Sequence, residues 1–204
     1  MAEYFDRWIS SGVIPPRIYV FPHGGKRSHY DYGDSLGETA FITELTPHID
    51  NSYRTISERQ GRGLEGFSMG GRGTARDMFK YPDVFCSAVP ISGGHQHEKR
   101  GSETYGEGSD DENLDPLNNS WDLAREYAAR SAGPEISILV VVGTADRNYE
   151  PNLEWMAHLE SLEIPFSKHI VPGVGHEVAD LYEILEDQIM QFHEQCFSSV
   201  ATVI

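Results

Sequence analysis

The chain has 204 residues, 39% of them hydrophobic and 11% aromatic, which suits one domain with a full hydrophobic core. Acidic residues number 32 against 16 basic ones, for a formal charge of −16 at pH 7. This charge disfavours nucleic acids and anionic membranes as partners, and strongly anionic substrates unless the pocket is locally basic. The longest apolar run, 136–142, is far too short to cross a bilayer.

Two features of the chain predict a cytoplasmic location. The first residues lack the basic start and apolar centre of a signal peptide. Cys86 and Cys196 are the two cysteines, and each lies in an apolar stretch. Two cysteines make no disulfide framework, so we expect reduced, buried thiols.

The first half of the chain predicts alternating helices and strands. Residues 17–21 follow Pro15-Pro16 and are aromatic or β-branched, so we expect a short, buried parallel strand there. The other predicted elements are an amphipathic helix over 1–13, a helix over 36–56 kinked at Pro47, a strand over 61–67, a helix over 74–80 and a strand over 84–92.

Residues 95–119 lose all apolar periodicity and are acidic and rich in Gly, Asn and Ser. We expect a surface insertion, because a loop of this length in a compact domain is usually a lid or a rim. Beyond it, the pattern predicts a helix capped by Ser120 and running to 130, a strand over 136–142, a helix over 151–162, a strand over 166–171 and a closing helix over 178–197.

This alternation predicts a single α/β domain, 1–204, with a mostly parallel sheet covered by helices on both faces. The strand over 61–67 leads directly into Gly66-Phe67-Ser68-Met69-Gly70, which fits the pattern G-x-S-x-G. This pattern places a serine nucleophile on a tight turn between a strand and a helix. The residues two before and two after the serine must be small enough for the turn to close, which explains the glycines there.

Chemistry-bearing residues gather on loops at the carboxyl ends of parallel strands. Three such loops carry Ser68, Asp146 and His176, in the order expected for a nucleophile, an acid and a base on an α/β-hydrolase sheet. Glu150 is the alternative acid. His95 and His97 could share a metal, but the run that follows has no cation-loop pattern, so no metal site is expected.

The same motifs resemble the esterase branch of the α/β hydrolases, which includes feruloyl esterases, S-formylglutathione hydrolases and mycolyltransferases. The stretches that carry the resemblance are 66–71, 81–85, 91–94, 143–146 and 171–176, with a further likeness at 21–25. The resemblance covers most of residues 14–195. It implies ester hydrolysis through an acyl-serine intermediate, with no cofactor.

The chain departs from this family in one respect, because the family places three strands before the one at 17–21. The fold is therefore expected to be an N-terminally truncated α/β hydrolase. One missing strand end normally supplies a second oxyanion donor beside the N–H of Met69. We expect His23 or Gly24 to replace it in a rearranged loop, with a homodimer covering the open sheet edge; a fragment or a weakened enzyme is the alternative.

The sequence thus predicts a serine carboxylesterase acting on a small or aryl ester. Two other hypotheses remain open at this point. The chain could be a hydrolase-like binding module without activity, or it could transfer the acyl group to an acceptor other than water.

Overall fold

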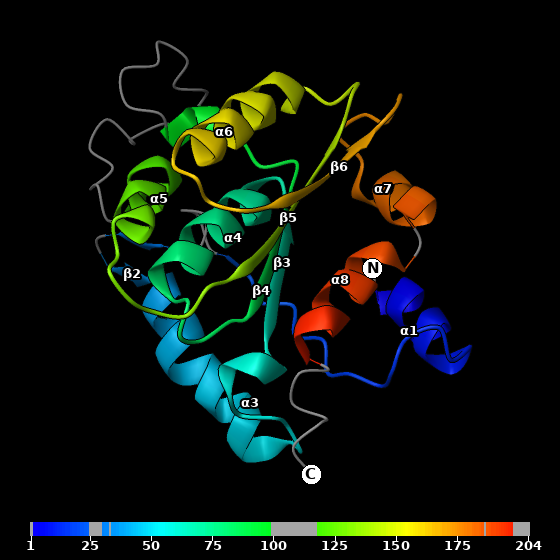
Figure 1. Ribbon diagram of the computed structural model, residues 1–204. Helices are drawn as coiled ribbons and strands as arrows, with labels where there is room; N and C mark the ends of the chain where they lie inside the picture. Colours follow the sequence, from blue (N-terminus) through cyan, green and yellow to red (C-terminus); the bar gives the residue numbers. More distant parts are fainter. Residues whose placement is uncertain (1, 25–29, 33, 99–117, 186, 198–204) are drawn as a thin grey trace.

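The computed structural model describes residues 2–24, 30–32, 34–98, 118–185 and 187–197. A parallel sheet with the strand order β3-β4-β5-β6 lies at its centre (Figure 1). The strands are β3 (Gly63–Phe67), β4 (Ser87–Ile91), β5 (Ser137–Gly143) and β6 (Ser167–Val171). Each strand lies beside the next one in the chain, so their carboxyl ends share one edge of the sheet.

Helices cover both faces of this sheet, as Figure 1 shows. One face carries α4 (Met69–Lys80), α5 (Ser120–Ala128) and α6 (Tyr149–Ser161); the other carries α1 (Ala2–Ser10), α7 (Val178–Leu185) and α8 (Gln188–Phe197). In β5, the buried side chains of Ile138 and Val140 face the core under α4, α5 and α6, whereas those of Leu139 and Val141 face the core under α1, α7 and α8. This explains the continuous apolar run of β5, since both of its faces are buried.

The predicted helix over 36–56 forms as three consecutive helical pieces, α2 (Gly37–Thr39), η1 (Ala40–Leu45) and α3 (Thr46–Ser52). The middle piece is a π-helix, in which the Thr46 N–H donates to the Phe41 carbonyl five residues earlier. Pro47 follows at the start of α3, where a missing N–H is tolerated best. In place of the kink predicted at Pro47, the helix therefore has a π-helical turn directly before this proline.

Two further boundaries differ from the prediction. The closing segment 178–197 holds two helices, α7 and α8, rather than one. Asn119, not Ser120, caps α5, because its side-chain oxygen accepts from the Trp121 and Asp122 N–H groups, each at 3.0 Å. The remaining short elements are β1 (Asp31–Tyr32), β2 (Ser35–Leu36), η2 (Arg59–Gly61) and η3 (His95–Glu98).

The prediction of a buried strand at 17–21 is wrong. The segment is extended but pairs with no described strand, and Phe21 is 61% exposed. Its side chains attach it to helices instead: Arg17 forms an ion pair with Glu194 of α8, and the Tyr19 ring stacks on Phe5 of α1 with centroids 4.0 Å apart. Among the described residues, β3 therefore has a strand partner on one side only, the side of β4.

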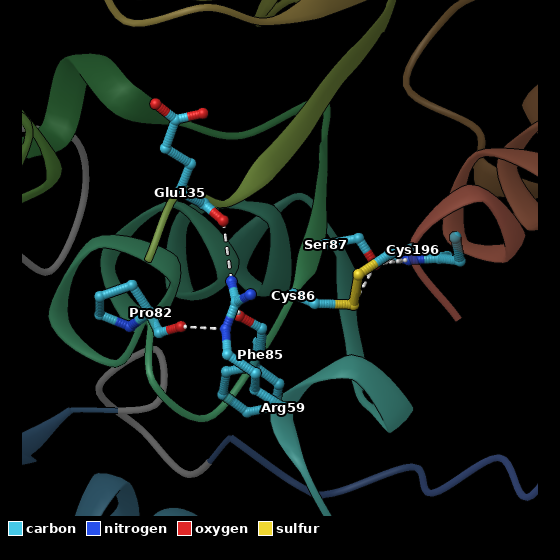
Figure 2. Close-up of a disulfide and its surroundings, with 8 residues drawn as sticks. Arg59, Pro82, Phe85, Cys86, Ser87, Glu135 and Cys196 are labelled. Carbon is cyan, nitrogen blue, oxygen red and sulfur yellow. Dashed lines mark hydrogen bonds between the residues drawn. A yellow bond between two sulfur atoms is a disulfide. The ribbon is translucent and has the colours of Figure 1, made fainter. Parts of the chain in front are cut away.

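The prediction of two reduced thiols is also wrong, because Cys86 and Cys196 form a disulfide. It joins the residue before β4 to α8 across 110 positions of the chain, with 6.2 Å between the Cα atoms (Figure 2). Figure 2 also shows Arg59 near this end of the sheet, donating to the Pro82 and Glu135 carbonyls at 2.9 and 2.8 Å. The disulfide thus fastens α8 to the amino end of the strands.

The predicted insertion at 95–119 is described only at its ends. These ends are not surface residues, because His95, Glu98 and Asn119 are each buried. Residues 99–117, and with them the expected lid or rim, lie outside the described residues. None of the helices in the described ranges combines the length and the apolar character that a membrane crossing requires.

Candidate active site

Ser68 lies between the last residue of β3 and the first residue of α4. Its backbone angles are φ 58° and ψ −112°, a conformation that residues other than glycine rarely adopt. The Ser68 N–H donates to the Ile91 carbonyl at the end of β4, at 2.8 Å. Residues held in such strained conformations cluster at functional sites. The turn therefore has the backbone geometry expected of a nucleophile elbow.

Glycines on both sides of Ser68 let the turn pack tightly, with Gly66 at the expected position before the serine and a different glycine required after it. A Cβ on Gly66 would lie 2.4 Å from the Gly70 carbonyl oxygen, and a Cβ on Gly71 would lie 2.4 Å from the Ile91 oxygen. A Cβ on Gly70 would meet nothing within 4 Å. The residue that must lack a side chain after the serine is thus Gly71, three positions on, and not Gly70.

The structure brings Ser68, Asp146 and His176 together in one hydrogen-bonded chain. The Ser68 hydroxyl lies 2.8 Å from His176 Nε2, and His176 Nδ1 lies 2.9 Å from both carboxylate oxygens of Asp146. The Asp146 side chain is fully buried, whereas the His176 side chain is 17% exposed. This arrangement lets the carboxylate orient the imidazole while the other ring nitrogen faces the hydroxyl.

The alignment of acid and base follows from the close packing of the loops after β5 and β6. The Thr144 and Ala145 N–H groups donate to the Val171 and Val174 carbonyls, each at 2.9 Å. A Cβ on Gly143 would lie 2.2 Å from the Val174 oxygen, so the two loops approach closely only because this residue is glycine. The two loops therefore hold Asp146 and His176 in register.

Two asparagines that the sequence analysis did not single out hold the acid loop in place. The Asn148 N–H donates to Asp146 Oδ1 at 2.7 Å, and its side chain donates to the Ser92 carbonyl at 2.9 Å. Asn152 donates to the Gly93 carbonyl at 2.8 Å. Both side chains are buried and join the loop after β4 to the start of α6. Their spacing of four along one helix was the only signal in the sequence.

A pocket of about 290 Å³ opens beside Ser68. The residues that line it and matter here are Ser68, Met69, Arg72, Gln96, His97 and Arg147. His23 and Gly24 do not line this pocket, and His23 is exposed at the end of the extended segment. Glu150, the alternative acid, is exposed on α6.

Met69 is the first residue of α4 and follows Ser68 directly. Backbone N–H groups in the first turn of a helix have no partner within the helix. The Met69 N–H is therefore available to an oxygen atom bound at Ser68, whereas the structure brings neither His23 nor Gly24 to this pocket as a second donor.

A buried ionic cluster lies behind the pocket. Glu98 is fully buried and forms an ion pair with Arg76, while Arg72 Nε lies 3.8 Å from the same carboxylate. The His95 ring stacks on Trp155 at 4.1 Å. Burial, and secondly the charges of Arg72 and Arg76, lower the pKa of His95 to about 3. His95 is therefore a neutral core residue.

The described residues contain no group of three or more His, Cys, Asp or Glu side chains that could hold a metal ion. His95 and His97, the pair considered from the sequence, thus form no such group within the described ranges.

A family model described as "Putative esterase" matches residues 1–179. Among curated proteins, esterase Rv1288 of Mycobacterium tuberculosis is 39% identical over 84 residues, which are 38% of this chain and 18% of that protein. An endo-1,4-beta-xylanase/feruloyl esterase of Xylanibacter ruminicola is 29% identical over 170 residues, 77% of this chain and 22% of that protein. The chain thus spans about a fifth of the length of these relatives.

Solved structures show the same fold. A ferulic acid esterase superposes with a TM-score of 0.70 at 24% identity, covering 96% of this chain and 77% of that one. The serine hydrolase FphF of Staphylococcus aureus superposes with a TM-score of 0.67 at 19% identity, covering 82% and 68%. At these identities the likeness establishes the α/β-hydrolase fold and nothing finer.

Proposed function

The chain belongs to the esterase family of the α/β-hydrolase fold, and on that premise we propose that it is a serine carboxylesterase in which Ser68, His176 and Asp146 act as nucleophile, base and acid. The observation that carries this proposal is the chain of contacts of 2.8 and 2.9 Å that joins the three side chains. A serine hydroxyl becomes an effective nucleophile only when a base within hydrogen-bond reach accepts its proton.

In the proposed reaction, Ser68 Oγ attacks the ester carbonyl while His176 Nε2 accepts the hydroxyl proton. The tetrahedral intermediate collapses, the alcohol leaves with the proton from His176, and the acyl group stays on Ser68. A water molecule then gives its proton to His176 and attacks the acyl-serine, releasing the acid and restoring the hydroxyl. Asp146 stabilises the imidazolium ion that forms in both steps.

The Met69 N–H is the proposed donor to the oxyanion. A second donor from His23 or Gly24 was expected, but neither residue lines the pocket. Removing one oxyanion donor lowers kcat by about a hundredfold to a thousandfold in other hydrolases. We therefore expect this chain by itself to turn over slowly on activated aryl esters.

Hydrolysis of 4-nitrophenyl acetate by purified protein tests the proposal, with Ser68→Ala as the inactive variant. Covalent labelling of Ser68 by a fluorophosphonate, detected by mass spectrometry, tests the nucleophile independently of turnover. Absence of both activity and labelling in correctly folded protein contradicts the proposal and favours a binding module. Adding alcohols or thiols and analysing the products distinguishes water from another acyl acceptor.

The homodimer expected from the sequence also belongs to this proposal. Among the described residues one edge of β3 has no strand partner, which supports a homodimer because unpaired strand edges invite association. Sedimentation of a monomer at micromolar concentration would contradict it. A cytoplasmic location stays a prediction, and the Cys86–Cys196 disulfide weighs against it because disulfides persist mainly in oxidising compartments.

A further inference from the structure

The pocket beside Ser68 is basic although the chain as a whole is strongly acidic. Two arginines and a histidine, Arg72, Arg147 and His97, line it, and none of the lining residues within the described ranges carries a carboxylate. The formal charge of the chain is −16, so a cationic pocket is not what its average surface would produce. The overall charge disfavours anionic substrates, but a locally basic pocket can bind them.

Arg147 is the cation most exposed to a ligand. It follows Asp146 directly in the loop after β5, and its side chain is exposed on the pocket wall. Within the described ranges, the Arg147 guanidinium has no hydrogen bond, ion pair or ring contact with another residue. No packing or folding role explains its position, whereas a charged substrate group would.

In the part of the chain that the structure describes, two carboxylates near the pocket are already paired. Asp146 faces His176 at 2.9 Å, and Glu98 is shared by Arg72 and Arg76. Neither carboxylate forms an ion pair with Arg147, so the Arg147 charge remains available to an anionic group in the pocket.

We propose that the ester substrate carries a carboxylate, which Arg147 binds from the rim of the pocket while the ester carbonyl lies at Ser68. This inference rests on the proposed esterase function and adds the substrate class. The planar guanidinium fork matches a carboxylate in a bidentate geometry, and such charge-assisted hydrogen bonds are about twice as strong as neutral ones.

Matched pairs of esters test the proposal on either side of the scissile bond. For a charge on the acyl side, 4-nitrophenyl 4-carboxybenzoate is compared with its neutral 4-carbamoyl analogue, whose shape is similar. For a charge on the alcohol side, 4-carboxyphenyl acetate is compared with 4-carbamoylphenyl acetate. In each pair the rigid ring prevents the carboxylate from attacking the ester itself.

The informative variant is Arg147→Gln, which removes the charge from an exposed side chain and leaves the fold intact. Arg54→Gln is its control, because Arg54 is also exposed and does not line the pocket. Arg147→Lys keeps the charge without the fork. For each protein we take the ratio of kcat/KM for the charged ester to kcat/KM for the neutral ester. Comparing this charged-to-neutral ratio between variant and wild type cancels the intrinsic reactivity of each ester.

We expect Arg147→Gln to lower this ratio by about tenfold to a hundredfold in one of the two pairs, the range of a lost charge-assisted hydrogen bond. Arg147→Lys should retain part of the preference, Arg54→Gln all of it, and high salt should weaken it. Unchanged ratios in both pairs, with neutral esters still hydrolysed, refute this inference and leave the esterase function standing. Failure of the wild type on all four esters refutes this inference, and it refutes the esterase function as well only if 4-nitrophenyl acetate is not hydrolysed and Ser68 is not labelled.

Discussion

Ser87 Oγ lies 2.7 Å from His193 Nδ1, in a second serine–histidine pair at the opposite end of the sheet from Ser68. The other ring nitrogen of His193 lies 3.4 Å from Glu65, so the pair even has an acid beside it. Ser87 is fully buried at the amino end of β4 and does not line the pocket beside Ser68. A similar set of side chains thus occurs where no substrate can reach it.

The first prediction uses these two pairs as an internal comparison. Ser68→Ala should abolish hydrolysis of 4-nitrophenyl esters, whereas Ser87→Ala should leave kcat/KM within about twofold of the wild type and lower the free energy of unfolding by about 1 to 2 kcal/mol, because His193 loses a buried partner. Circular dichroism confirms folding of both variants. Loss of activity in folded Ser87→Ala protein would contradict the assignment of Ser68.

The second prediction concerns the two glycines after the serine. Gly71→Ala should lower the free energy of unfolding by several kcal/mol, about 3 or more, since its Cβ would lie 2.4 Å from a backbone oxygen. Gly70→Ala has open space around its Cβ and replaces glycine within a helix, which should stabilise the protein by up to about 1 kcal/mol. Urea unfolding of both variants tests this contrast, and equal effects would contradict the packing described for the turn.

The third prediction is a pH dependence of stability that originates at Asp77. Burial raises the pKa of Asp77 from 3.8 to about 8. Between these values the unfolded chain is ionised while the folded protein keeps its proton. The free energy of unfolding therefore falls as pH rises, by about 1.4 kcal/mol per pH unit from this group, and levels off above pH 8.

Asp77→Asn should remove this contribution, because an amide does not ionise. The stability of the variant relative to the wild type should consequently increase from pH 5 to pH 8, as measured by urea unfolding at each pH. Asp83→Asn provides the control, since Asp83 is exposed. Parallel pH profiles for wild type and Asp77→Asn would show that Asp77 is ionised in the folded state.

The fourth prediction concerns the disulfide. Cys86 and Cys196 close a loop of 110 positions, for which chain entropy predicts a stabilisation of about 3 to 5 kcal/mol. A reducing agent should lower the urea midpoint of the wild type towards that of Cys196→Ser, and it should not affect the variant. Free-thiol titration under denaturing conditions is the direct check. Two titratable thiols in the untreated protein would restore the original expectation of reduced cysteines.

A feature could be predicted from the sequence where it depends on residues that are close together along the chain. The strand, turn and helix around Ser68 follow from local patterns, and the parallel direction of β3 to β6 follows from the alternation of strands and helices. Ser68, Asp146 and His176 follow β3, β5 and β6, so the parallel sheet places all of them at one edge. The amino-acid sequence alone therefore determined the fold class and which three side chains meet.

Only the tertiary structure decided the features that depend on partners distant along the chain. An extended segment such as 17–21 becomes a strand only if another strand offers it hydrogen bonds, and its side chains bind α1 and α8 instead. Cys86 and Cys196 could be paired only once α8 lay against the start of β4. Likewise, Arg72 and Arg147 share a pocket because α4 and the loop after β5 converge, a proximity that no local pattern records.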